Sequence, residues 1–238
     1  MSTIGTQPSR RNTVFSALSE RRRRRLLGLL ADRSEELPEL ELTVKLAIRE
    51  TDRSLDALTD EEIERVHRLL YHQDLPLLDS VSLVDWDRRG ETVRRTDHAV
   101  YTDPTFRAVI DDEDAHWDDI LPNLADTRRR RLLRILSDSE DRTAVDTLAT
   151  KLLVSEVTDE GEATVSADCF DTLRVELHHV HLPKLDDSGL IDWNRDEETV
   201  AYVGHPDLDR TWLTPRVIDT ADRAAESARL AGRDSLGQ

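Results

Sequence analysis

The side chains best suited to chemistry are positively charged or polar residues in two short clusters, residues 65–73 and residues 88–94. Arginine, histidine and glutamine donate hydrogen bonds to phosphate oxygens and to the edges of DNA bases. Their types therefore indicate nucleic-acid recognition rather than catalysis. The candidate DNA-binding residues are Arg65, His67, Arg68, His72, Gln73, Arg88, Arg89 and Arg94.

An internal repeat shows which elements must position these clusters. The segment DLPLLDSVSLVDW at residues 74–86 returns as HLPKLDDSGLIDW at residues 181–193, at a spacing of 107 residues. The arginine-rich segments SERRRRRLLGLL and DTRRRRLLRIL align at a spacing of 106 residues. Because loops absorb insertions that helices cannot, the extra residue is expected in the connections at residues 51–59 and 157–166. The repeat predicts two units of similar fold.

Each unit has the pattern of three helices followed by a β-hairpin. The third helix of the first unit begins at residues 59–62, which resemble a capping box. The Leu-Pro step should then kink or break that helix, because proline lacks a backbone N–H. Short strands at residues 83–86 and 92–93, and at 190–193 and 199–203, complete the hairpins. The predicted fold class is mainly α with small β-hairpins, a tandem winged helix-turn-helix.

Composition along the chain predicts further segments around the two units. The N-terminal residues are polar, whereas the Ala-rich C-terminus repeats apolar residues at helical spacing. The middle is acidic but contains aromatic and aliphatic residues that suggest partial packing. The predicted segments are a disordered lead at 1–18, a winged-helix unit at 19–96, an acidic linker at 97–124, a second winged-helix unit at 125–206 and a helical tail at 207–238.

The charge composition points to a salt-rich environment. The formal net charge is -17, and Lys45, Lys151 and Lys184 are the only lysines among 33 basic residues. Net negative charge maintains solubility in concentrated salt, although an ordinary acidic protein remains the alternative. The single cysteine, Cys169, cannot form an internal disulfide, and neither a secretory signal nor a membrane-spanning apolar run is apparent. We expect a cytoplasmic protein that does not bind membranes.

The repeated segments resemble a known family. SERRRRRLLGLL, DTRRRRLLRIL and HLPKLDDSGLIDWN are similar to a winged-helix-like domain of unknown function that is abundant in haloarchaeal proteins, often in tandem. The resemblance covers residues 19–95 and 126–203, and the second copy matches better, because Leu77 and Ser82 in the first copy replace Lys184 and Gly189. More distantly, the pattern His-Leu-x-x-Leu-x-x-x-Gly-Leu resembles ArsR-like repressors. The resemblance implies a haloarchaeal transcriptional regulator without catalytic residues.

The two units differ in charge. Residues 19–95 contain 15 basic and 18 acidic residues, a net of -3, whereas residues 126–203 contain 10 and 18, a net of -8. A winged helix places its third helix in the major groove and its basic wing on phosphates, so the first unit is the better candidate for double-stranded DNA. The second unit would pack or pair, and it or the tail could form a homodimer.

Two alternatives remain open at this stage. The arginines of the first cluster could simply be solvated, as charged side chains usually are. Both units could instead form a protein interaction or signalling module that does not bind DNA. The runs at residues 21–25 and 128–131 could contact phosphates, cover the edge of the core or form ion pairs.

A metal site and an enzyme are less favoured. His178, His179 and His181 stand close to Cys169, but no paired ligand spacing supplies a complete site. The chain carries no P-loop, nucleophile-elbow, metalloprotease or dinucleotide-binding pattern. We expect no metal, no cofactor and no catalytic residues.

Overall fold

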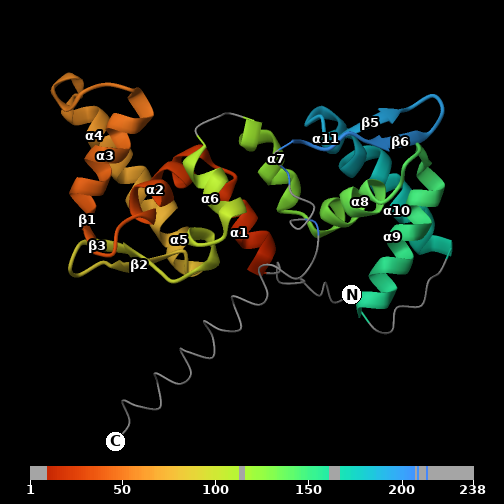
Figure 1. The fold of residues 1–238 in the computed structure, drawn as a ribbon, viewed down its shortest axis with the longest axis horizontal. Helices are drawn as coiled ribbons and strands as arrows, with labels where there is room; N and C mark the ends of the chain where they lie inside the picture. Colours follow the sequence, from red (N-terminus) through yellow and green to blue (C-terminus); the bar gives the residue numbers. More distant parts are fainter. Residues whose placement is uncertain (1–9, 113–115, 161–166, 207, 209–212, 214–238) are drawn as a thin grey trace, which may run out of the picture. The chain divides into compact units, whose positions relative to one another are not determined.

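The computed structural model describes residues 10–112, 116–160, 167–206, 208 and 213. The chain forms two compact units that meet in sequence between Asp118 and Asp119 (Figure 1). The predicted tail at 207–238 lies outside the described residues, apart from Leu208 and Leu213, which are both buried.

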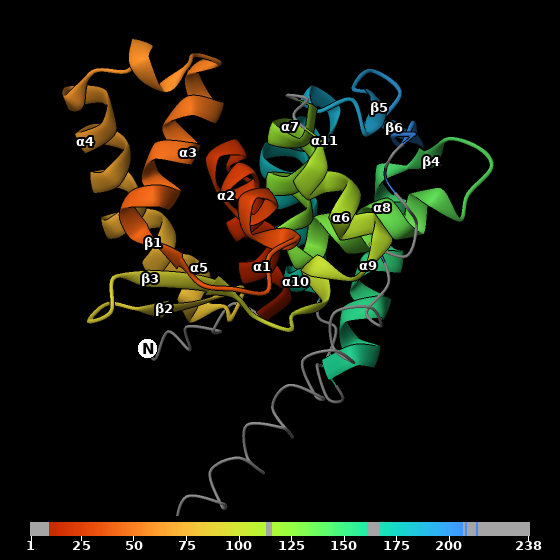
Figure 2. The same cartoon turned by 60° about the vertical axis from the view of Figure 1, so that its left-hand side comes forward.

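The first unit is a bundle of helices with a small sheet at one side (Figure 2). Helix α2 packs on α3 and on β3, while α5 packs on β2. The core consists mainly of leucines, including Leu26, Leu30, Leu42 and Leu46. Its elements are α1 (Arg10–Leu18), α2 (Arg21–Ala31), β1 (Leu37–Pro38), α3 (Glu39–Thr51), η1 (Leu55–Ala57), α4 (Asp60–Leu69), η2 (Leu70–Asp74), α5 (Leu75–Ser80), β2 (Val84–Asp87), β3 (Thr92–Arg95), η3 (Ala99–Tyr101) and α6 (Pro104–Asp111).

The second unit repeats this order of elements. Helix α8 packs on α9 and on β6, and α11 packs on β5. Its elements are α7 (His116–Leu124), whose residues 116–118 still belong to the first unit, α8 (Thr127–Ser137), β4 (Thr143–Ala144), α9 (Val145–Glu160), α10 (Ala167–Glu176), η4 (Leu177–His181), α11 (Leu182–Asp187), β5 (Ile191–Asn194) and β6 (Thr199–Tyr202). The predicted class, mainly α with two small sheets and a hairpin at the end of each unit, is confirmed.

The sheets have three strands each, one more than the sequence predicted. Strand order is β1-β3-β2 in the first unit and β4-β6-β5 in the second, and all pairs are antiparallel. Val93 of the middle strand pairs with Leu37 on one side and Trp86 on the other. Strands β1 and β4 span only two residues, and so short a strand shows no alternation in the sequence. Strand β1 lies between α2 and α3, and strand β4 lies between α8 and α9. Each completes the winged-helix-like arrangement of its unit.

The structure corrects the prediction of a disordered lead for residues 10–18. They form α1, whose Val14, Phe15 and Leu18 are buried. Ile120, Leu121 and Leu124 of α7 occupy the matching positions 106 residues later and are also buried. The repeat therefore begins earlier than its arginine runs. Residues 97–124 likewise contain η3, α6 and α7, and Phe106 of α6 packs against Phe15 with ring centroids 6.2 Å apart.

The Leu-Pro step does not break the third helix. The chain stays helical from residue 60 to residue 80 because η2 is a π-helical turn, in which the Leu75 N–H donates to the Leu70 carbonyl five residues back. Leu182 and Leu177 form the same bond in η4. The wider turn accommodates a following proline, which cannot donate a hydrogen bond and needs room for its ring. The predicted break is therefore wrong, and a π turn lies in its place.

The arginine runs donate hydrogen bonds to the carbonyls at the C-terminal ends of the preceding helices. Arg23 Nε donates to the Ala17 carbonyl at 2.6 Å, and Arg24 Nη1 donates to the Leu18 carbonyl at 3.0 Å. In the second unit, Arg129 donates to the Asn123 carbonyl and Arg130 to the Leu124 carbonyl. The last carbonyls of a helix lack partners within it, so a guanidinium there stabilises the helix end. Of the alternatives for these runs, the structure assigns these four arginines a structural role.

The arginine preceding each pair forms ion pairs. Arg22 Nε lies 2.6 Å from the Asp74 carboxylate, which is fully buried beside the π turn. Arg128 Nε lies 2.7 Å from Glu156, and its Nη1 also bonds Glu176. Each pair joins the start of one helix to helices that follow much later in the sequence.

Candidate nucleic-acid interface

The outer face of α4 and η2 carries five of the predicted residues. Thr59 begins α4 with a confirmed capping box, in which its hydroxyl accepts from the Glu62 N–H at 3.3 Å and its N–H donates to Glu62 at 2.9 Å. These hydrogen bonds and Arg53 lower the pKa of Glu62 to about 2. Val66 and Leu70 are buried, which orients the helix. Arg65, Arg68, His72 and Gln73 are exposed as a result, and His67 is half-buried.

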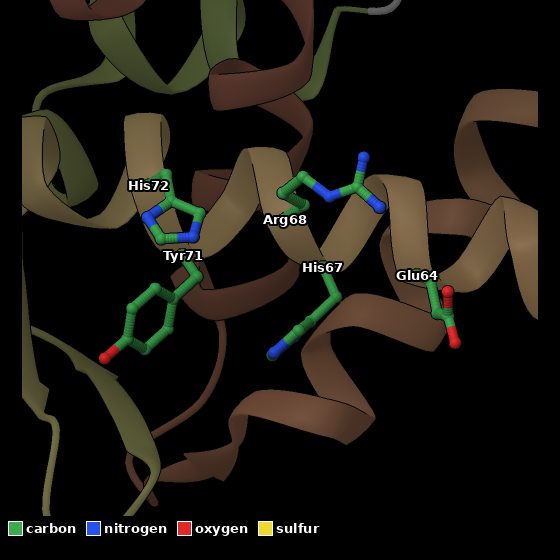
Figure 3. A pocket seen from close by; sticks show the side chains of 5 residues that line it. All are labelled: Glu64, His67, Arg68, Tyr71 and His72. Carbon is green, nitrogen blue, oxygen red and sulfur yellow. The ribbon is translucent and has the colours of Figure 1, made fainter.

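A shallow hollow of about 340 Å³ lies along this face, lined by Glu64, His67, Arg68, Tyr71 and His72. Figure 3 shows these side chains in succession along the helix, with His67 and Tyr71 projecting to the same side. His67 Nδ1 lies 3.2 Å from the Thr43 hydroxyl of α3, so its ring is held against the neighbouring helix. The surface therefore alternates cationic, aromatic and acidic groups rather than forming a purely positive stripe.

The wing is anchored to η2 through an aromatic contact. Trp86 is 7% exposed, and its Nε1–H donates to the buried Glu39 carboxylate. Tyr71 meets the Trp86 ring edge-on, with centroids 5.1 Å apart. The Arg88 guanidinium lies over the same indole, 4.2 Å from the Trp86 ring centroid. An arginine stacked on an indole is oriented before it meets a ligand. Trp86 thus anchors the wing in the core of the first unit.

The wing turn presents Arg89 beside Arg88. The Asp87 carboxylate accepts the Arg89 backbone N–H at 2.9 Å, and Glu91 adopts a left-handed backbone with φ 52°. Both arginine side chains are exposed. Arg94 differs, because its guanidinium pairs with Asp85 across the hairpin, with Nε 2.9 Å from the carboxylate. The structure thus brings Arg88 and Arg89 together at the tip and occupies Arg94 in a local ion pair.

The same face of the second unit is built from other side chains. Val175 and Val180 stand at the positions of Arg68 and Gln73, and they are 58% and 41% exposed. Arg174, at the position of His67, lies 2.9 Å from Asp146 and 2.8 Å from Glu198 of the wing. This arginine is therefore neutralised within the unit. The wing tip carries Asp196 and Glu197, which repel phosphates.

One feature of the wing is shared by both units. Arg195 lies over Trp193 with 4.6 Å to the ring centroid, as Arg88 lies over Trp86. His178 takes the place of Tyr71 against this indole, at 5.6 Å. Val145 replaces Glu39, and Trp193 Nε1 has no hydrogen-bond partner among the described residues. The repeated Trp-x-Arg pattern was present in the sequence and could have identified the stack, whereas its contact with residue 71 could not be read there.

The histidines of the second unit differ in their environments. His181 is buried, His178 is half-buried against Trp193, and His179 is exposed. Burial lowers the pKa of His181, while Asp126 opposes this effect and Arg129 adds to it. Within the described ranges, no group of three or more His, Cys, Asp or Glu side chains is arranged to hold a metal ion.

Comparison with known families assigns the chain to one of them. A family model described as a domain of unknown function (DUF7344) matches residues 15–94 and again residues 122–201. The chain therefore belongs to this family and contains two tandem copies of its domain. Neither the curated proteins nor the solved structures gave a match. None of the helices in the part of the chain described is long and apolar enough to cross a membrane.

Proposed function

We propose that the first unit binds double-stranded DNA and that the protein is a transcriptional regulator of a salt-rich cytoplasm. The observation that carries this proposal is a set of four exposed arginines on α4 and the wing, Arg65, Arg68, Arg88 and Arg89. None of them forms a salt bridge with a carboxylate of the described residues. In a chain of 50 acidic and 33 basic residues, these arginines without a salt bridge are available on one face to bind an anionic ligand.

In this arrangement the helix would contact DNA bases and the wing would contact phosphates. Arg65, Arg68 and Gln73 lie on the helix that enters the major groove in winged-helix proteins, where arginine pairs with guanine and glutamine with adenine. Arg88 and Arg89 would contact phosphates from the wing, with Arg88 oriented by its stacking on Trp86. Glu64 on the same face would disfavour sequences that bring a phosphate or an acceptor edge next to it.

Concentrated salt changes which contacts can supply the binding energy of such an interface. Phosphate contacts weaken steeply as ionic strength rises, so base contacts and DNA shape must supply more of the binding energy. Low overall basicity is then compatible with DNA binding. A face that mixes arginine with aromatic, amide and acidic side chains fits this regime better than a uniformly positive one.

The experiment is a selection from a randomised double-stranded DNA library in molar potassium chloride, followed by anisotropy titrations of the selected duplex. The variant Arg65→Glu/Arg68→Glu should weaken binding by at least about tenfold. Its preference for the selected duplex over an unrelated duplex should also shrink, because Arg65 and Arg68 would contact the bases. The matched control is Lys151→Glu/Arg195→Glu in the second unit, which changes the net charge equally and should bind within about twofold of wild type. Failure of the wild type to select any sequence, or equal weakening in both variants, would refute the proposal.

A further inference from the structure

The outer face of α10, η4 and α11 carries a stripe of four exposed residues, Asp171, Val175, Val180 and Lys184. The steps between them are four, five and four residues, and the five-residue step crosses the π turn η4. A π turn holds more residues than an α turn, so that longer step still returns to the same side of the helix. The four side chains therefore lie on one exposed side, with the two valines in the middle and opposite charges at the ends.

The stripe has a charged residue at each end, Asp171 and Lys184. Asp171 and Lys184 form no salt bridge with any described residue, whereas nearby charges are engaged. Arg174 pairs with Asp146 and Glu198, and Glu176 bonds Arg128. Several charges around the stripe are thus paired within the second unit, whereas Asp171 and Lys184 at its two ends are exposed.

The stripe is complementary to itself when reversed. Asp171 and Lys184 are equally far from the midpoint between Leu177 and His178, and so are Val175 and Val180. An antiparallel contact across a two-fold axis at that midpoint would place Val175 against Val180 of the partner copy, and Asp171 against Lys184. Two-fold interfaces require this kind of self-complementarity. The matching stripe in the first unit, Glu64, Arg68, Gln73 and Leu77, lacks it because Glu64 would face Leu77.

We infer that this face of the second unit is the interface with a second copy of the chain, formed by antiparallel packing of α10, η4 and α11 on the same elements of the partner. The valines supply the attraction, which persists in concentrated salt, and the Asp171–Lys184 pairs set the register. Dimer formation is independent of the proposed DNA binding, because association is measured without DNA. It would, however, give the protein two copies of its first unit, as a two-fold symmetric operator needs.

The first test measures the mass of the full-length protein by light scattering and sedimentation over a range of concentrations in molar potassium chloride. The wild type should approach twice the chain mass of 27.2 kDa. Val175→Glu/Val180→Glu should raise the dissociation constant at least about tenfold, since it replaces the apolar centre with like charges. Arg68→Glu/Gln73→Glu, which changes the equivalent positions of the first unit, should leave the mass unchanged. A monomeric wild type, or a double-valine variant that is as dimeric as wild type, overturns the inference.

The second test checks the antiparallel register, and it uses substitutions small enough to keep the fold. In a Cys169→Ser background, Val175→Cys protein is mixed with tagged Val180→Cys protein and oxidised with diamide. The mixture should yield the mixed disulfide at least about fivefold faster than either protein forms its own disulfide, since disulfide formation requires Cβ atoms about 4 Å apart. Equal rates for all pairs, or self-pairing of either variant alone, would exclude this register and overturn the inference.

Discussion

The two units share a backbone but differ in what they display on it. Both have the same order of helices, the same three-stranded sheet and the same π turn before a proline. At the positions where the first unit exposes Arg68 and Gln73, the second exposes Val175 and Val180. A duplicated fold can therefore keep its packing while the side chains at two exposed positions change from polar to apolar, because exposed side chains contribute little to folding.

Some buried residues also differ at matching positions of the two units. Asp74 is buried against Arg22 in the first unit, whereas His181 is buried at the matching position of the second. Glu39 accepts from the Trp86 indole, whereas Val145 stands in its place. Some features are therefore required by the fold in both copies, and others belong to one copy alone. Substitutions at two matched pairs of positions and at His181 test this distinction, beginning with the largest expected effect.

Replacing Arg24 should be the most damaging of these changes. Its guanidinium is 1% exposed and donates to the Leu18 and Ser19 carbonyls and to Asp118. Arg24→Ala should lower the free energy of unfolding of the first unit by about 3 kcal/mol, because the buried Leu18 carbonyl would lose its charged donor and Asp118 would keep only Arg21. Circular dichroism during denaturant unfolding in molar potassium chloride measures the change.

The control is Arg65→Ala, which removes an exposed arginine and should change stability by less than about 0.5 kcal/mol. Arg130→Ala should destabilise the second unit as Arg24→Ala destabilises the first, since Arg130 donates to the Leu124 carbonyl. If either buried arginine proved as dispensable as Arg65, the helix-closing role common to both units would be wrong.

Acidification should affect the second unit through His181. Burial lowers its pKa below the ordinary 6.5, so on acidification the unfolded chain takes up a proton before the folded unit does. Stability from this group is present in full above about pH 7 and falls as the pH drops below about 6.5, by at most ~1.4 kcal/mol per pH unit. His181→Gln should flatten this part of the stability profile. An unchanged profile would mean that the histidine is not what distinguishes the second unit in acid.

The smallest expected effect concerns the turn after the third helix. Ser82 has φ 60° and Gly189, its counterpart, has φ 70°, a left-handed backbone that costs other residues about 1 kcal/mol. Ser82→Gly should therefore raise the melting temperature of the first unit slightly. Gly189→Ala should lower that of the second, although a Cβ there would meet no atom within 4 Å. Calorimetric scans of both variants measure the two shifts, and shifts in the same direction would contradict this account of the turn.

Much of the fold could be predicted because it depends on short-range patterns. The repeat, the capping box at Thr59 and the hairpins after each Leu-Pro step were all evident from residue spacing. The one-residue shift is also confirmed between α3 and α4, since α9 begins 106 residues after α3 and α10 begins 107 after α4. Helix α1 was missed because its buried residues stand among polar ones, and the π turn because proline alone predicts a break.

The candidate site was predicted as a set of residues but not as an arrangement. Arg65, Arg68, Arg88 and Arg89 are exposed as expected for a binding face, and their role in DNA binding stays a prediction. Arg94 pairs with Asp85, and His67 is held by Thr43, which the sequence did not indicate. The stacking of Arg88 on Trp86 and the edge-on contact of Tyr71 depend on how the hairpin folds back on the helix.

The sequence by itself determined the two repeated units, their helices and hairpins, and which side of each helix is apolar, because periodicity and turn chemistry act within a few residues. Only the tertiary structure determined which arginines form ion pairs or hydrogen bonds and which remain exposed. Arg22 meets Asp74 across 52 residues of chain, Arg24 closes the helix before it, and Arg68 remains exposed. Ion pairs such as Arg22–Asp74 form only when the folded backbone brings distant segments together, so identical side chains in one sequence are either held in contacts or left exposed according to what packs beside them.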